Sequence, residues 1–191
     1  MRGAYASRAI PNTGVTFGRA RPTNVRRMRL PIRSSYWASD RLLAGEYPGA
    51  WDGREAARRL RAFANHDVTL FVDLTHPADG LEPYERLLES PAIRVAHPIV
   101  DMGTTTVPHM SRILDDIDAA LQEEQTVYVH CWGGRGRTGT VVGCWLVRHG
   151  LDDGDAIRKI ARLRRDVEDA SAQSPETSAQ CAMVTGWKRG S

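Results

Sequence analysis

The segment His130–Gly139 contains the residues best suited to chemistry in this sequence. It reads His-Cys-Trp-Gly-Gly-Arg-Gly-Arg-Thr-Gly, so that Cys131 and Arg137 are separated by five residues. A cysteine thiolate is a strong nucleophile, and a planar guanidinium can hold two phosphate oxygens at once. The pair therefore predicts nucleophilic attack on a phosphate ester.

Glycines make the backbone between these two residues suitable for binding an anion. Gly133, Gly134 and Gly136 can adopt conformations that other residues avoid, which lets successive N–H groups converge on one point. The helix that we expect after this turn adds free amides and the positive end of its dipole. A phosphate dianion fits such a site. The same field favours a thiolate, so we expect Cys131 to be ionised at neutral pH.

Four flanking residues complete the predicted site. Thr138 can donate a hydrogen bond to the sulfur, and we expect His130 to orient the loop through ring hydrogen bonds rather than act as a base. Trp132 and Arg135 lie within the loop and are expected to contact the substrate. Arg135 has two interpretations. It is either an extra cation that favours a second acidic group on the substrate, or a surface arginine that is paired with an acid.

Asp101 is the predicted general acid. A leaving group departs slowly unless it is protonated, and general acid catalysis typically contributes about 10²–10⁴-fold. Asp101 follows an expected strand, at the start of a loop that contains Gly103 and Pro108. We expect this loop to be mobile and to bring the carboxyl group over the phosphate. After the leaving group has departed, the ionised Asp101 can act as the base that activates the water which hydrolyses the phosphocysteine. The alternative is an ordinary solvated aspartate.

Alternating strands and helices are predicted to position these residues. The expected strands span 41–45, 68–74, 93–100 and 126–130. The expected helices are one that follows Asp52 and ends at Ala64, and others at 83–88, 110–122, 138–149, 152–165 and 174–188. In the last helix, we expect Ser174 at the N-cap and Pro175 at the first helical position. The pattern predicts an α/β fold with a central, mostly parallel, twisted sheet flanked by helices.

Charge is distributed unevenly along the 191 residues. Residues 1–39 contain eight arginines and no acid, whereas the rest contains 18 basic and 23 acidic residues, which together give the net charge of +3. We interpret residues 1–34 as a basic tail without stable structure and residues 35–191 as one domain. The tail is a solvated extension, an upstream addition to a start at Met28, an organelle transit peptide, or a contact for nucleic acid or acidic partners.

Composition excludes several classes of protein. No apolar run approaches the roughly 18 residues of a membrane span. Three cysteines cannot form a disulfide scaffold, and no secretory signal is visible. We therefore expect a cytoplasmic protein. No spacing of His, Cys and carboxylates suggests a metal site, so that no metal or other cofactor is expected, and Cys144 is predicted to be a core residue.

The segment around Cys131 resembles the His-Cys-x5-Arg-Ser/Thr signature of the cysteine-dependent protein tyrosine phosphatases. More narrowly, Leu42–Gly49, Val127–Gly134 and Ser174–Thr177 are similar to segments of compact dual-specificity phosphatases, in particular kinase-associated-phosphatase-like and bacterial members. The resemblance covers about residues 35–188. It implies a two-step reaction through a phosphocysteine, without metal. We expect phosphotyrosine to be a substrate, and whether phosphoserine and phosphothreonine are also hydrolysed stays open.

The resemblance also assigns roles to residues outside the loop. The general acid of the family lies in a segment that resembles Pro98–Asp101. A late glutamine positions the attacking water in the wider phosphatase family, and Gln180 matches that region; a solvated helix glutamine is the alternative. Asp73, His76 and Tyr84 either line one wall of the cleft or cap the end of a strand.

The favoured function is a phosphatase that acts on a phosphorylated protein. Two other functions stay open. One is a pseudophosphatase that binds phosphorylated partners without turnover. The other is the same chemistry on RNA 5′ ends or phosphoinositides, for which the basic tail and Arg135 are the evidence.

Overall fold

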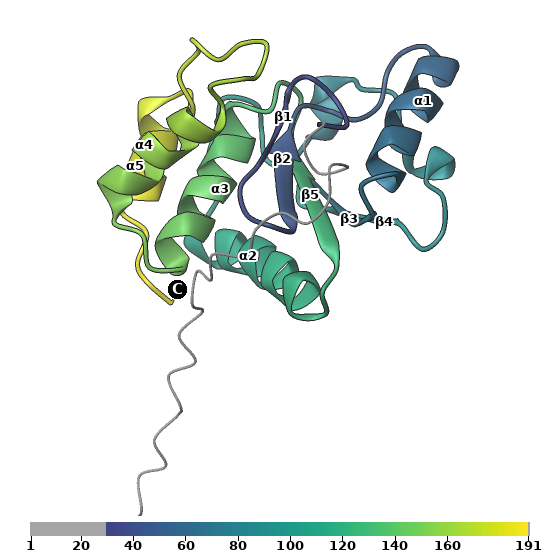
Figure 1. The fold of residues 1–191 in the computed structure, drawn as a ribbon. Coiled ribbons are helices and arrows are strands. Elements are labelled where there is room, and N and C mark those ends of the chain that lie inside the picture. Colours follow the sequence, from purple (N-terminus) through teal and green to yellow (C-terminus); the bar gives the residue numbers. More distant parts are fainter. Residues whose placement is uncertain (1–29, 191) are drawn as a thin grey trace, which may run out of the picture.

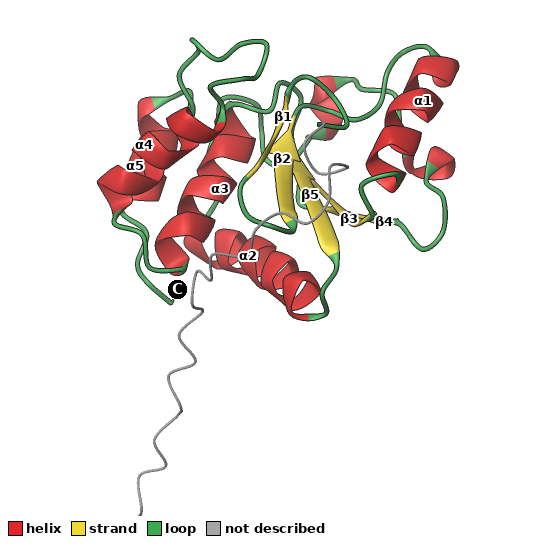
Figure 2. Cartoon of the chain, viewed as in Figure 1, coloured by secondary structure: helices red, strands yellow, loops and turns green. Residues whose placement is uncertain are grey.

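A five-stranded sheet forms the centre of residues 30–190, the part of the chain that this computed structural model describes (Figures 1 and 2). The strands are β1 (Ser35–Trp37), β2 (Leu42–Gly45), β3 (Val68–Asp73), β4 (Ile93–Ala96) and β5 (Thr126–His130). Their order across the sheet is β1-β2-β5-β3-β4. Only β1 and β2 pair antiparallel, and the other three pairs are parallel. The predicted α/β class with a mostly parallel sheet is confirmed.

The register of the parallel strands brings four loops to one edge of the sheet. His130, the last residue of β5, lies opposite Gly45 of β2 and Asp73 of β3. Asp73 in turn lies opposite Ala96 of β4. The segments that follow these residues therefore meet at the carboxyl ends of the strands, where open parallel sheets bind their ligands.

Helices cover both faces of the sheet. The helices are α1 (Gly53–Ala64), η2 (Pro77–Asp79), η3 (Glu85–Leu87), α2 (Val107–Gln122), α3 (Gly136–Arg148), α4 (Asp153–Leu163) and α5 (Ser178–Thr185). Figure 1 shows α1 on one side of the sheet and α3 on the other, with α4 and α5 packed on the outer side of α3. Within residues 30–190, no helix is both long enough and apolar enough to cross a bilayer.

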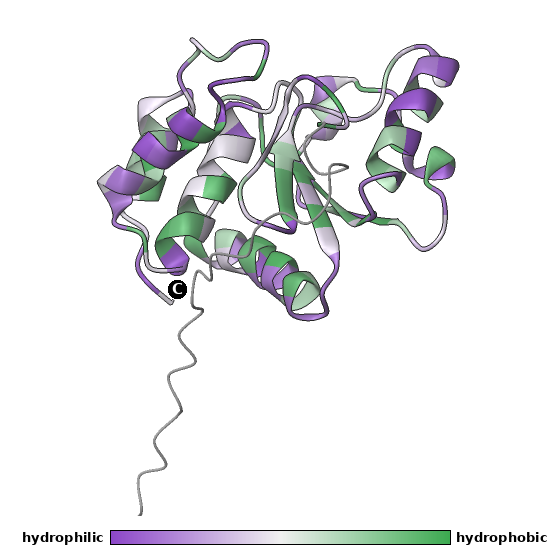
Figure 3. Ribbon diagram, viewed as in Figure 1, coloured by the Kyte–Doolittle hydropathy of each residue, from purple (hydrophilic) through white to green (hydrophobic). Residues whose placement is uncertain are grey.

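Side chains of the central strands alternate between two hydrophobic clusters. Val127 and Val129 of β5 belong to the cluster that includes α2 and α3. Tyr128 points to the opposite face, where it contacts Phe63 of α1 and Phe71 of β3. Such alternation is expected of strands that are covered on both faces. Hydrophobic segments accordingly concentrate in the central strands and α3 in Figure 3.

Several boundaries of the predicted elements differ in the structure, and two of the differences bear on the site. The strand expected at 93–100 ends at Ala96, and Pro98, which has no N–H group, lies just beyond its end. The helix expected at 174–188 begins at Ser178, with Thr177 and not Ser174 at the N-cap. Ser174 instead donates its hydroxyl hydrogen bond to the carbonyl of Arg135. The segment between Ser174 and Thr177 thus packs on the loop between β5 and α3, which we call the catalytic loop (residues 131–135), rather than extending α5.

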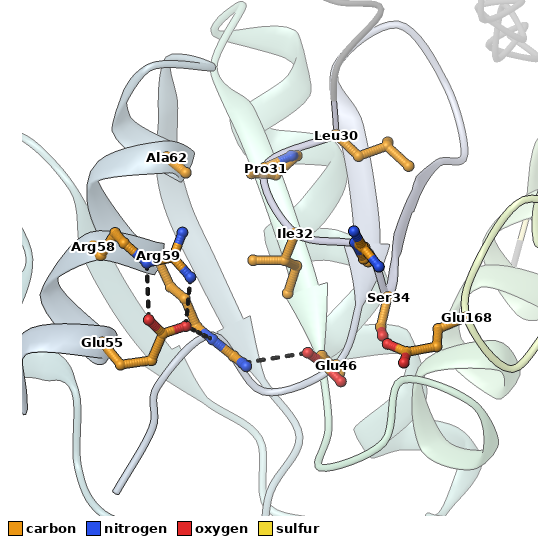
Figure 4. Close-up of a pocket in the computed structure, with 11 residues that line it drawn as sticks. Leu30, Pro31, Ile32, Ser34, Glu46, Glu55, Arg58, Arg59, Ala62 and Glu168 are labelled. Atoms are coloured by element: carbon orange, nitrogen blue, oxygen red, sulfur yellow. Dashed lines mark hydrogen bonds and ion pairs between the residues drawn. The ribbon is translucent and has the colours of Figure 1, made fainter. Parts of the chain in front are cut away.

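The predicted basic tail lies mostly outside the described residues, since only residues 30–34 of it are described. Leu30 and Ile32 pack against the hydrophobic cluster on the α1 side of the sheet. A cavity of about 300 Å³ lies between this segment and α1 (Figure 4). Arg59 in its wall pairs with Glu46 and Glu55. None of the predicted catalytic residues lines this cavity.

Candidate active site

The loop between β5 and α3 places the predicted nucleophile at the edge of the sheet. Cys131 follows β5 directly and is only 2% exposed. Trp132 and Gly133 are exposed, whereas Gly134 and Gly136 are buried. The helix α3 begins at Gly136, two residues earlier than predicted. Its free amides therefore lie at the catalytic loop.

Close packing against β2 determines the shape of this loop. Gly134 has a φ of +69°, in the left-handed region that favours glycine. A Cβ atom at this position would lie 2.4 Å from the carbonyl carbon of Gly45, closer than atoms can approach. The Tyr47 amide also donates a hydrogen bond to the Trp132 carbonyl (2.8 Å). The glycine is thus required by both conformation and space.

Arg137 is held by three residues of the site. Its side chain is 1% exposed. Nη1 donates to Asp79 Oδ2 (2.6 Å) and to the Ile99 carbonyl (3.0 Å), and Nη2 lies 2.9 Å from Asp101 Oδ1. Nε is buried and has no hydrogen-bond partner among the described residues. Burial opposes its charge, but the charges of Cys131 and the carboxylates outweigh burial and raise the pKa of Arg137. Nη1 is thus held by two protein groups, whereas the Nε hydrogen can be donated to a ligand.

Asp79 is a site residue that the sequence analysis missed. It lies in η2, after β3, and its side chain is 5% exposed. Its Oδ2 accepts a hydrogen bond from the His76 amide (3.1 Å) as well as from Arg137. An aspartate before a glycine is typical of an ordinary turn, so that no local signal distinguishes it.

Asp101, the predicted general acid, lies against Arg137. Its side chain is 49% exposed, and its neighbours Val100 and Met102 are also exposed. The carboxyl group is therefore held by the arginine but remains accessible to a substrate. Asp101 is thus a half-exposed aspartate that is paired with Arg137, and its role as general acid stays a prediction.

His130 forms one of the ring hydrogen bonds expected of an orienting residue. Its ring is fully buried, and Nε2 lies 2.7 Å from the Tyr84 hydroxyl. Nδ1 has no hydrogen-bond partner among the described residues, and the nearby Asp73 Oδ1 is 3.8 Å away. Burial lowers the pKa of His130 to about 4, although the Asp73 carboxylate favours the protonated form. The ring is therefore neutral near pH 7.

The structure combines both interpretations of Asp73, His76 and Tyr84. Asp73 accepts hydrogen bonds from the amide and hydroxyl groups of Thr75, which cap the end of β3, and pairs with Arg94 (2.7 Å). These three residues also line a cavity of about 250 Å³ beside the site.

Thr138 does not make the predicted hydrogen bond. Its buried hydroxyl donates to the Gly45 carbonyl (3.4 Å) and not to the Cys131 sulfur. Thr138 therefore links α3 to the end of β2 in this structure. A role at the sulfur requires its hydroxyl to rotate.

Arg135 is paired with acids. It forms ion pairs with Glu176 and with Asp169, whose Oδ2 lies 3.4 Å from Arg135 Nε. Two carboxylates thus face one guanidinium, so that Arg135 does not present a free cation to a substrate. The interpretation as a paired arginine is the one that the contacts support.

Gln180 is fully buried rather than solvated. Its Oε1 accepts hydrogen bonds from the amides of Glu176 (3.0 Å) and Thr177 (3.1 Å). Its Nε2 donates to the Gly103 carbonyl (3.0 Å). Gln180 therefore connects the start of α5 with the loop that carries Asp101.

Cys144 does not contribute to the site, and neither does metal binding by the described residues. Cys144 is buried in α3, and burial raises its pKa to about 12, in agreement with the predicted core position. Among residues 30–190, no three His, Cys or carboxylate side chains are grouped so that they could hold a metal ion.

The site thus combines a cysteine after a strand, an arginine at the start of a buried helix and a carboxyl group against that arginine, the arrangement that the resemblance to cysteine-dependent phosphatases implies. Residues 48–184 match the family model PTP-SAK, described as "Swiss Army Knife protein, DSP-PTPase phosphatase domain". The chain belongs to this family of dual-specificity phosphatase domains. The predicted resemblance is thereby confirmed.

Solved structures share the fold of this chain. Tk-PTP in its active form is 24% identical, with a TM-score of 0.65, over 79% of this chain and 93% of Tk-PTP. Kinase-associated phosphatase is 18% identical, with a TM-score of 0.64, over 75% of this chain and 83% of its own. Both similarities show the fold.

The mouse (Mus musculus) protein named phosphatidylglycerophosphatase and protein-tyrosine phosphatase 1 is 35% identical over 78 residues, 39% of each chain. The first curated relatives are matched over only 34%, 38% and 45% of their own lengths.

Lowering the pH should destabilise the domain through His130. The folded-state pKa of about 4 lies below the ordinary value of about 6.5. Between these values the unfolded chain binds a proton at His130 that the folded chain does not, so stability falls as the pH falls. Between about pH 7 and pH 4, we expect the free energy of unfolding of the wild type to fall by roughly 2–3 kcal/mol more than that of a His130→Gln variant. Urea unfolding at both pH values measures this difference, and an equal loss in both proteins would contradict it.

Proposed function

We propose that this domain hydrolyses phosphotyrosine in proteins through a phosphocysteine on Cys131. The observation that carries the proposal is the state of Arg137. Its Nη1 is fixed by buried partners, its Nε has no partner among the described residues, and its Nη2 contacts only an exposed carboxylate. A buried, unpartnered donor is costly. An oxyanion that accepts hydrogen bonds from Nε and Nη2 would remove that cost.

In the first step, the Cys131 thiolate attacks phosphorus while Arg137 and the loop amides bind the phosphate oxygens. The sulfur–phosphorus bond forms and the ester bond breaks. Asp101 donates its proton to the leaving oxygen. The exposed position of Asp101, beside Arg137, supports this role.

In the second step, water attacks the phosphocysteine. Asp101, now ionised, takes a proton from the water as the new phosphorus–oxygen bond forms. The sulfur–phosphorus bond breaks and releases inorganic phosphate and the thiolate. The same carboxyl group thus serves as acid and then as base.

The surroundings of the site favour a protein substrate over a polyanion. Because Glu176 and Asp169 pair with Arg135, no free cation is offered by this loop residue to a second phosphate. Exposed Trp132 and Val100, next to the nucleophile and the acid, offer apolar contacts to an aromatic ester. The mouse relative carries both lipid and protein-tyrosine phosphatase in its name, so that a lipid phosphate is the second candidate.

A substrate panel with a Cys131→Ser control tests the proposed function. We expect turnover of phosphotyrosyl peptides to exceed that of phosphoinositides and RNA 5′ ends, and Cys131→Ser to lower it by at least about a thousandfold. Tight peptide binding without turnover would instead support a pseudophosphatase. Preferred turnover of a phosphoinositide would assign the lipid substrate, and unchanged turnover in the variant would exclude Cys131 as the nucleophile.

Replacement of Asp101 should separate catalysis from binding. We expect Asp101→Ala to lower kcat for phenyl phosphate by about 10²–10⁴-fold, because the leaving group is no longer protonated. The KM should stay constant or fall, since Arg137 Nη2 loses a competing carboxylate. Steady-state kinetics measure both constants. A rise in KM with unchanged kcat would contradict the acid role.

A further inference from the structure

The loop that carries Asp101, residues 97–106, is attached to the rest of the domain before the acid. The Ile99 amide donates to the Leu74 carbonyl at the end of β3 (3.1 Å). The Ile99 carbonyl accepts the Nη1 hydrogen bond of Arg137 (3.0 Å). The backbone two residues before the acid is thus tied directly to the phosphate-binding arginine.

A histidine joins the two ends of this acid loop. His109, in the first turn of α2, has Nε2 3.2 Å from His97 Nδ1 and Nδ1 2.7 Å from the Thr105 hydroxyl. His97 is held in turn by Asp116 (2.7 Å). The two ends of the acid loop are therefore fixed by these hydrogen bonds. They do not contact the segment around Asp101, which must be held by other residues.

Gln180 supplies that attachment from α5. Because its Oε1 accepts hydrogen bonds from two backbone amides, those of Glu176 and Thr177, the amide orientation is determined and Nε2 must face the Gly103 carbonyl. The same amide packs on Gly136, where a Cβ atom would lie 2.9 Å from Nε2. Gln180 therefore contacts Gly136, which follows the catalytic loop at the start of α3, and Gly103 of the acid loop at once.

We propose that Gln180 is a positioning residue that holds the acid loop so that Asp101 lies over the phosphate. The Gly103 bond lies two residues after the acid, and the Ile99 bond lies two residues before it. This role differs from that of a residue that positions the attacking water. It rests on the proposed function, because it acts through Asp101 as the general acid.

The test uses aryl phosphates whose leaving groups differ in acidity. Gln180→Glu keeps an oxygen for the amides of Glu176 and Thr177, since glutamate is a normal partner in a capping box, but it loses the donor to Gly103. Because only poor leaving groups need the acid, we expect kcat/KM to fall by about tenfold or more for phenyl phosphate. For 2,4-dinitrophenyl phosphate, it should fall less than about threefold.

Two further variants separate positioning from loss of structure. Gln180→Met removes both hydrogen-bonding functions at a similar size and should show the same dependence on the leaving group. Thr177→Ala removes the side-chain cap of α5, because Thr177 Oγ1 accepts a hydrogen bond from the backbone amide of Gln180. The hydrogen bond from Gln180 Nε2 to the Gly103 carbonyl is not part of this cap and should remain. Thr177→Ala should lower the melting temperature by a few degrees and lower kcat/KM equally, if at all, for both substrates.

A double variant gives the decisive comparison. If Gln180 acts through Asp101, adding Gln180→Glu to Asp101→Ala should change kcat/KM for phenyl phosphate by less than about twofold. Independent, multiplied losses would overturn the proposal. So would a fall in kcat with a phosphoenzyme burst and unchanged kcat/KM, which would assign Gln180 to the water of the second step. If Asp101→Ala alone had no effect, the proposed acid would fail, and Gln180 with it.

Discussion

The contact of Arg137 Nη1 with Asp79 and Ile99 is the interaction on which the rest of the site depends. A guanidinium that is almost completely buried is destabilising unless it is paired and hydrogen-bonded. Here the pairing also fixes its direction, because Nη1 is held from the side opposite to Nε. The same contact that makes the buried charge tolerable therefore presents Nε and Nη2 to an anion.

Two aspartates share this arginine, and their exposure separates their roles. Asp79 is 5% exposed and belongs to a turn that is closed by hydrogen bonds, whereas Asp101 is 49% exposed. In the mechanism that we propose, a phosphate displaces Asp101 from Arg137 Nη2 without disturbing Asp79, and the Asp101 carboxyl group then turns toward the leaving group. The sheet makes this possible, because its parallel register brings the segments after β3, β4 and β5 to one edge.

The features that could be predicted from the sequence lie within short segments of the chain. The spacing of Cys131 and Arg137, the glycines between them and the apolar helix that follows lie within one short segment, so the catalytic loop could be interpreted directly. Asp101 could be assigned from the strand before it and from a family resemblance. The alternation of strands and helices was sufficient for the fold class, since both patterns are set by periodic burial.

Contacts between distant segments could not be predicted in the same way. Asp79 lies 58 residues before Arg137, and Gly103 lies 77 residues before Gln180. The sequence does not distinguish the two interpretations of Arg135, because Glu176, with which it pairs, is distant along the chain. The wrong N-cap of α5 has a similar cause, because Ser174 and Thr177 are both good capping residues. In the structure, Thr177 accepts the hydrogen bond of the Gln180 backbone amide, and Ser174 contacts the distant Arg135 carbonyl.

A structure of the domain with bound vanadate or tungstate tests the central claim most directly. The account predicts an oxyanion over Cys131 that accepts hydrogen bonds from Arg137 Nε and Nη2. Nη1 should stay on Asp79 and Ile99, and Asp101 should have moved away from Nη2. An oxyanion bound elsewhere, or an Arg137 that leaves Asp79 to reach it, would contradict the account.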